Sequence, residues 1–186
     1  MLAPAPLPKT LRTLLLAPLT LLVALLAASA PAQASPQACA GAGVTAGKAS
    51  KEAISEAVRC LVNAQRSARR LTAVQHATAL RRAATAHARD MVRRSFFAHV
   101  SPTGSTLAER ARRAGYPGST LGEDIGWGTG ELGTPDAIVD AWMKSPPHRA
   151  IILHPRFREI GVGVTLGTPA DRSAAGAVYV INLGRR

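Results

Sequence analysis

The sequence lacks the motifs of the commonest hydrolases. Neither a Gly-x-Ser-x-Gly nucleophile elbow nor a His-Glu-x-x-His zinc motif occurs in its 186 residues. It has no internal repeat, and no second long apolar run follows residues 14–28. These absences argue against an elbow-type serine hydrolase, a zinc protease of the helical type, a repeat protein and a multi-span membrane protein.

Acidic residues are also scarce. Eleven Asp and Glu stand against 23 Lys and Arg, which gives a formal net charge of +12. Such a surplus favours contact with anionic envelope components such as teichoic acids, anionic lipid headgroups or acidic polysaccharide. Nucleic acid would suit the charge too, but no nucleic-acid motif accompanies it and none is expected as a partner. The arginines cluster at 66–70, 81–82, 89–94 and 110–113, and we interpret these clusters as solvated helix faces.

The N-terminus has the pattern of a secretory signal peptide. Lys9 and Arg12 precede the apolar run 14–28, and Ala32-Gln33-Ala34 offers small residues for cleavage. A retained membrane anchor is the alternative. Cleavage after residue 34 would leave 152 residues with a net charge of +10 and no transmembrane segment, enough for one domain. We therefore predict a signal peptide at 1–34, a flexible Ala/Gly/Ser-rich lead-in at 35–52, one domain at 53–186, and a secreted, monomeric protein.

Cysteine is limited to Cys39 and Cys60. Export would place both in an oxidising compartment, where pairing is favoured. The bridge would close a loop of about twenty residues and contribute about 3 kcal/mol in the chain-entropy account. We predict a structural disulfide that ties the lead-in to the first helix.

Helical periodicity fills the first part of the predicted domain. His87 falls on the apolar face of the second helix, so we interpret it as a core histidine rather than a ligand. Capping residues and prolines delimit the later helices. The expected helices cover about 50–65, 74–94, 107–114, 134–145 and 148–153.

The last part changes to a period of two. Ile160, Val162 and Val164 alternate with Gly161 and Gly163, and 177–183 is rich in β-branched residues. Two strands in a hairpin are expected, with the glycines allowing close approach of a covering element. Helices followed by strands in one domain indicate an α+β fold in which helices cover a short sheet.

Three short segments carry the candidate functional side chains. They are FFAHVSPTG (96–104), GEDIGWG (122–128) and WMKSPPHRAIIL (142–153), which contribute His99, Glu123 and His148. Glycine, proline and aromatic neighbours are typical of turns and pocket walls. We predict that the two imidazoles and the carboxylate converge on one cleft.

The same segments, followed by EIGVG at 159–163, resemble the bacterial branch of the CAP superfamily, which includes cysteine-rich secretory proteins, antigen 5 and pathogenesis-related proteins and is also called the SCP-like extracellular domain. The resemblance runs from about 57 to 184. It implies a three-layer α-β-α sandwich with a short antiparallel sheet, an extracellular location, and a cavity tetrad of two histidines and two glutamates. His99, Glu123 and His148 match three members, whereas Ser145 stands where the second glutamate would be and Asp124 replaces the usual Asn.

The residues leave two chemistries open. His99, Glu123 and His148 could hold a divalent cation such as zinc, with His99 and His148 as ligands, although ligands this far apart in sequence are weak evidence. They could also form an acid–base set, but no activated nucleophile accompanies them.

Two functions follow from these alternatives. The favoured one is a binding module at the cell envelope, possessing a His/Glu-lined cleft for a lipid-like or glycan-like ligand or a protein partner, without established catalysis and with possible wall association left open. The alternative is a secreted hydrolase of peptide or cell-wall bonds that uses the same three residues, with or without a metal.

Overall fold

A four-stranded sheet forms the centre of the domain. The computed structural model describes residues 39–186. The strands are β1 (Gln75–His76), β2 (Thr120–Thr129), β3 (Glu159–Leu166) and β4 (Gly176–Arg185), in the spatial order β1-β3-β4-β2. β4 pairs antiparallel with both β3 and β2, whereas the two-residue β1 pairs parallel with β3. β2, which carries Glu123, is therefore an edge strand.

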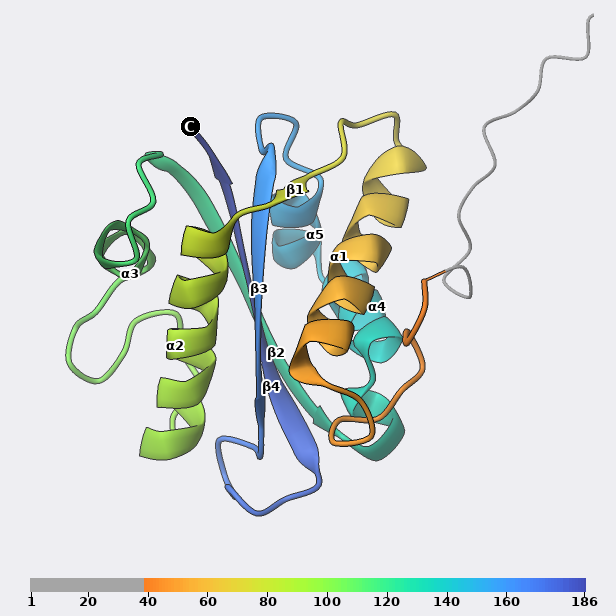
Figure 1. The fold of residues 1–186 in the computed structure, drawn as a ribbon, viewed down its shortest axis with the longest axis vertical. Helices are drawn as coiled ribbons and strands as arrows, with labels where there is room; N and C mark the ends of the chain where they lie inside the picture. The colour runs from red at the N-terminus through yellow and green to blue at the C-terminus, as the bar shows by residue number, and fades with distance from the viewer. Residues whose placement is uncertain (1–38) are drawn as a thin grey trace, which may run out of the picture. The chain divides into compact units, whose positions relative to one another are not determined.

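Helix α2 (Thr78–Arg94) covers one face of the sheet (Figure 1). Gly161 and Gly163 make this contact possible. A Cβ on Gly163 would lie 2.3 Å from backbone atoms of Ala84 and Thr85, and one on Gly161 would lie 2.0 Å from the backbone of Arg81. The predicted role of these glycines is confirmed: they let the helix backbone approach the strand.

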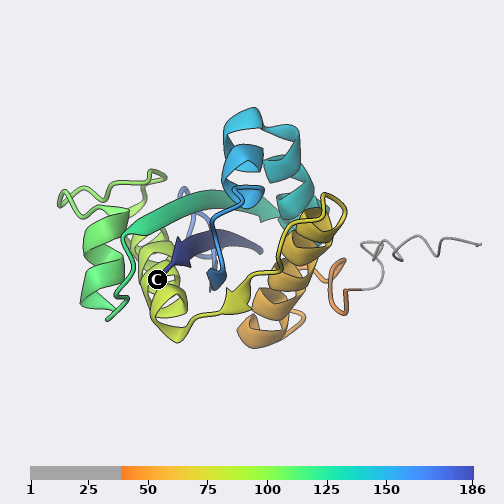
Figure 2. The same ribbon diagram turned by 90° about the horizontal axis from the view of Figure 1, so that it is seen from above.

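The opposite face is covered by α1 (Lys51–Ser67), α4 (Pro135–Lys144) and α5 (Pro146–Ile152), which together with α2 give three layers (Figure 2). Alternate β4 residues point to this side, where Tyr179, Ile181 and Leu183 are fully buried. Trp142 of α4 packs in the same core, and its indole N–H donates to the Ile125 carbonyl at 2.9 Å. Helix α3 (Leu107–Arg113) and the short 3-10 turn η2 (Gly130–Gly133) complete the fold.

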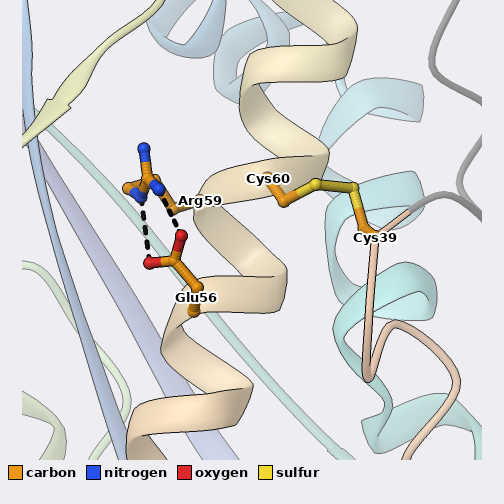
Figure 3. The surroundings of a disulfide bond; sticks show 4 residues. All are labelled: Cys39, Glu56, Arg59 and Cys60. Carbon is orange, nitrogen blue, oxygen red and sulfur yellow. Dashed lines mark hydrogen bonds and ion pairs between the residues drawn. A yellow bond between two sulfur atoms is a disulfide. The ribbon is translucent and has the colours of Figure 1, made fainter.

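The predicted disulfide between Cys39 and Cys60 is present and joins the start of the described chain to α1 (Figure 3). Cys39 and Ala42 are buried, and the Asp136 backbone N–H donates to the Ala42 carbonyl at 3.0 Å. The segment before α1 is thus anchored to both α1 and α4.

The α+β class and the helix-covered sheet agree with the prediction from sequence. The structure adds the parallel strand β1, which is too short to have a periodic signal, and shows that 120–129 is one continuous strand. The expected boundary between lead-in and domain at residue 53 stays a prediction; α1 itself begins at Lys51. The predicted signal peptide at 1–34 lies outside the described residues.

The interpretation of the arginine clusters as solvated faces was wrong for two members. Arg66 is fully buried, and its guanidinium donates to the carbonyls of Ile152, His154 and Phe157 at 2.7, 3.1 and 3.2 Å. It therefore fixes the turn between α5 and β3. Arg110 is the second exception and belongs to the candidate site.

Within residues 39–186, no helix combines the length and the apolar character that crossing a membrane requires.

Candidate functional site

Glu123 is the central residue of the candidate site. It lies on β2 opposite Asn182 of β4, and its side chain is directed to the α2 face of the sheet. The residue is only 4% exposed. A buried carboxylate requires compensation by charge and hydrogen bonds, so its partners define what it can do.

Protein donors occupy both carboxylate oxygens of Glu123. His99 Nδ1 donates to Oε1 at 3.0 Å, and the Arg110 guanidinium donates to Oε2 at 2.7 Å. The Asn182 amide, oriented to satisfy both of its neighbours, donates to Oε2 at 3.0 Å and accepts from the Ala84 N–H at 3.2 Å. These hydrogen bonds fix the position of the Glu123 carboxylate, which accepts all of them.

The segment after α2 presents His99 to this carboxylate. Ser95 ends α2 in the left-handed conformation (φ 53°), and Phe96 packs against the core beneath α2. A tight turn follows at 101–104, where the Gly104 N–H donates to the Ser101 carbonyl at 2.8 Å. The His99 side chain remains 54% exposed. Because the carboxylate can only accept, Nδ1 of neutral His99 carries the proton and Nε2 is its unprotonated nitrogen.

His148 contacts a hydroxyl next to its own helix. It lies on α5, and its Nδ1 is 2.7 Å from the hydroxyl of Ser145, the residue that stands in place of the family's second glutamate. Burial lowers the pKa of His148, and the nearby charge of His99 lowers this pKa further. The structure therefore joins His99 to Glu123 and pairs His148 with Ser145; the convergence of all three on one cleft stays a prediction.

Three further residues surround Glu123, and their closeness to it was not predicted from the sequence. Arg110 is 6% exposed and forms an ion pair with Glu123, against the prediction that its cluster is solvated. A signal existed in the sequence, because Arg110 shares one helix face with Leu107, Ala111 and Ala114. Asn182 is the second, and strand periodicity gives no means of pairing it with Glu123.

His87 is the third member of these surroundings. Its burial was predicted, and its Nε2 donates to the Ala98 carbonyl at 3.0 Å. The same nitrogen lies 3.9 Å from Glu123 Oε1. Burial lowers the pKa of His87, so the ring is neutral beside the Glu123–Arg110 pair. His87 is therefore a core histidine that packs next to the Glu123 carboxylate.

Asp124 occupies the opposite face of β2. It is fully buried between Gly122, which faces Phe157 and Ile151, and Gly126, which faces Trp142. Neither carboxylate oxygen has a hydrogen-bond partner within residues 39–186. Burial, with a further contribution from the charge of Glu123, raises the pKa of Asp124 to about 8. Asp124 is therefore a neutral acid at pH 7 and adds no charge to the site.

The geometry does not fit a divalent cation. No group of three His, Cys, Asp or Glu side chains in the described part of the chain is placed to hold a metal ion. Glu123, the expected carboxylate ligand, is already bound by Arg110 and His99. A metal ion bound by His99 and His148, as predicted, would therefore have no third ligand among the described residues.

Comparison with known proteins decides the family. Residues 60–182, more than half of the chain, match the CAP family, described as the cysteine-rich secretory protein family. The chain belongs to the CAP family. Its sequence is also similar to the uncharacterized protein YkwD of Bacillus subtilis (strain 168), with 38% identity over 103 residues that cover 55% of this chain and 39% of that protein.

Two solved structures have a similar fold. An extracellular protein of Bacillus anthracis that contains an SCP domain superposes with a TM-score of 0.63 and 26% identity, covering 73% of this chain and 41% of that one. An outer surface protein of Borrelia burgdorferi gives a TM-score of 0.60 at 18% identity and covers 69% of this chain and 90% of that one. The chain spans about two fifths of the length of the two Bacillus proteins.

Proposed function

We propose that this CAP domain is a binding module at the cell envelope, in which His99, held by Glu123, contacts a ligand or protein partner. The observation that carries the proposal is the full engagement of Glu123 by Arg110 and His99. A carboxylate fixed in this way orients an imidazole, which is the role of a positioning residue in a binding site. His99 is the exposed member and offers its Nε2 to the ligand.

An extracellular location is supported by three observations. The B. anthracis relative is described as an extracellular protein, the disulfide between Cys39 and Cys60 fits an oxidising compartment, and the N-terminal sequence predicts a signal peptide. The basic composition favours retention at an anionic wall or membrane surface after export. Attachment to the cell wall is part of the proposal.

The alternative function is hydrolysis of a peptide or cell-wall bond. It needs a group that accepts a proton from water, and Glu123 would have to release one of its three partners, His99, Arg110 or Asn182, to do so. Ser145 and His148 form a hydroxyl–imidazole pair, but the pair uses Nδ1 of a histidine three residues away on the same helix. Within residues 39–186 no carboxylate binds the other ring nitrogen of His148 to orient it as a base, so binding is the better supported function.

The experiment compares binding with turnover in the same preparations. Purified protein is mixed with isolated bacterial cell walls, and the bound fraction is measured for wild type, His99→Ala, Glu123→Gln and the control His76→Ala, whose side chain is exposed on β1. Release of soluble wall fragments and cleavage of an unfolded protein substrate are followed in parallel.

We expect His99→Ala and Glu123→Gln to bind the walls at least several-fold more weakly than wild type and His76→Ala, without turnover by any of the four. Turnover by wild type that disappears in His99→Ala would contradict the binding function and support hydrolysis instead. Equal binding by all four proteins would show that His99 does not contact the bound wall component.

A further inference from the structure

A groove separates α2 from the segment that leads into α3. Its volume is about 470 Å³, and its walls include Arg82, Arg94, Arg110 and Arg113 together with the hydroxyl residues Ser101 and Ser105. The groove is not the cleft predicted around His99 and His148, since neither histidine lines it. Only Arg110 and His87 belong to both the groove and the surroundings of Glu123.

The groove carries a surplus of positive charge. Arg94 pairs with Asp90 at 3.0 Å, and Arg110 pairs with Glu123. Arg82 and Arg113 instead donate to neutral oxygens: Arg82 to the Ala114 carbonyl at 2.7 Å, and Arg113 to the Ser105 hydroxyl. Neutral acceptors position a guanidinium without cancelling its charge, and the exposed Glu109, one turn before Arg113 on α3, offsets only part of the charge of Arg113. Arg82 and Arg113 therefore leave a positive surplus on opposite walls of the groove.

Local hydrogen bonds set the α3 wall of the groove before any ligand binds. The capping box between Thr106 and Glu109 sets the start of α3, and the Ser105 N–H donates to the Ser101 hydroxyl at 3.0 Å. Arg110 is buried, donates to the Ser105 carbonyl at 2.7 Å, and has a buried Nε–H without a partner within residues 39–186. Preorganised donors bind an anion without the entropic cost of ordering long side chains.

The arrangement suits a phosphate group in particular. Guanidinium groups that approach from two helices can each bind a different oxygen of a tetrahedral anion, and Arg is the residue best matched to phosphate geometry. The groove is larger than a phosphate group alone, and its hydroxyl-bearing wall suits a polar body attached to the phosphate. A smaller hollow of about 260 Å³, lined by Arg81, Arg82 and Arg89, extends the positive surface along α2.

We propose that the groove between α2 and α3 is a second binding site, which takes the phosphate of a polyol phosphate such as glycerol phosphate. The same chemistry is present in a soluble phosphodiester and in the headgroup of an anionic lipid. The site does not depend on the function proposed for His99, because the arginines that face the groove make no contact with that residue.

Calorimetric titration with glycerol 3-phosphate tests the site, and glycerol serves as the uncharged control ligand. The variant Arg82→Gln/Arg113→Gln removes the charges of both arginines. Arg149→Gln/Arg156→Gln removes the same net charge from exposed positions outside the groove. Ala86→Glu adds an acid to the groove wall on an exposed helix position, and Ala108→Glu is its control on α3. Thermal unfolding confirms that each variant is folded.

We expect wild type and both control variants to bind glycerol 3-phosphate alike, and the two groove variants to bind about tenfold more weakly or not at all because charge-assisted contacts are lost. Absence of saturable binding to wild type, or equal weakening in the groove and control variants, would overturn the proposal. If Arg82→Gln/Arg113→Gln does not fold, Ala86→Glu decides the result alone.

A second arm distinguishes the two sources of the phosphate. Vesicles of phosphatidylglycerol are compared with vesicles of phosphatidylcholine in a sedimentation assay. Vesicle binding that glycerol 3-phosphate competes away identifies a lipid headgroup in the groove, and binding of glycerol 3-phosphate without vesicle binding identifies a soluble ligand. Vesicle binding that both double arginine variants weaken equally reflects surface charge alone and contradicts the groove.

Discussion

Arg110 and Glu123 form a buried ion pair, 2.7 Å long, that joins helix α3 to the edge strand β2. Their side chains are 6% and 3% exposed. The pair places the carboxylate where His99 can bind it, and the same arginine forms part of the wall of the groove on the α2–α3 side. Loss of one partner would leave the other charged group buried without its counterion and with only neutral hydrogen-bond partners.

Arg110→Met should therefore be strongly destabilising. Removal of one member of a buried pair costs about 3–5 kcal/mol, because the desolvated charge that remains has no counterion. Urea unfolding measures the loss. Arg112→Met, an exposed neighbour on the same helix, is the control and should change stability by less than about 0.5 kcal/mol.

The double variant Arg110→Met/Glu123→Gln separates charge from packing. It removes the uncompensated carboxylate and should recover a part of the stability lost in Arg110→Met. An equal loss in Arg110→Met and Arg112→Met would show that the ion pair does not hold α3 to the sheet.

Asp124 should make the protein less stable as the pH rises from acid to neutral. Its pKa is raised from 3.8 to about 8 in the folded state, so between about pH 4 and pH 8 the folded protein keeps a proton that the unfolded chain has released. The free energy of unfolding then falls with pH by at most about 1.4 kcal/mol per unit and levels off above pH 8.

Asp124→Asn removes this titration. We expect the variant to be more stable than wild type at pH 7, with a difference between the two that grows from pH 4 to pH 8. Chemical unfolding at a series of pH values measures the difference, and subtraction cancels the opposite acid-side contributions of His87 and His148, whose pKa values are lowered by burial. Asp140→Asn on the exposed face of α4 is the control. A difference that does not depend on pH would contradict the assignment of a neutral Asp124.

Gly163→Ala should prevent the close packing of α2 on the sheet. The added methyl would lie 2.3 Å from helix backbone atoms, so helix and strand would have to separate. We expect a loss of several kcal/mol, of the size that overpacking reaches when backbone rather than a side chain obstructs the new atom. Gly43→Ala is the matched control, because its Cβ would meet its nearest neighbour at 3.8 Å. Thermal unfolding of both variants measures the effect, and a similar small change in both would show that the sheet can move away from α2.

The local elements were predictable because their signals are local. Periodicity, caps and prolines identify the helices, and alternation with glycine identifies β3 together with the close approach at Gly163. The partners of Glu123 were not predictable in the same way, since Arg110 and Asn182 reach it only through the sheet register and the docking of α3. Arg66 and Arg110 were misassigned for a related reason: a charge cluster in the sequence does not reveal which member is directed inward to buried acceptors.

The pairing of His148 shows the limit of transfer from a family pattern. The resemblance implied that His148 and Glu123 belong to one cavity tetrad and indicated that the second glutamate is absent. It did not indicate that Ser145, which stands in that position, would bind His148 itself. The contact depends on the start of α5 at Pro146, because this makes Ser145 the N-cap residue and brings its hydroxyl to the His148 ring in the first turn.

The protonation state of His99 tests the account most directly, because the proposed function depends on Glu123 orienting this ring. Nitrogen-15 NMR of the imidazoles at a pH where they are neutral distinguishes the two tautomers, with the exposed His76 as an internal reference. We predict that neutral His99 carries its proton on Nδ1, donated to Glu123, and has an unprotonated Nε2 open to a ligand. A proton on Nε2 of His99 would mean that Glu123 does not hold the ring, and the proposed binding site would lose its organising contact.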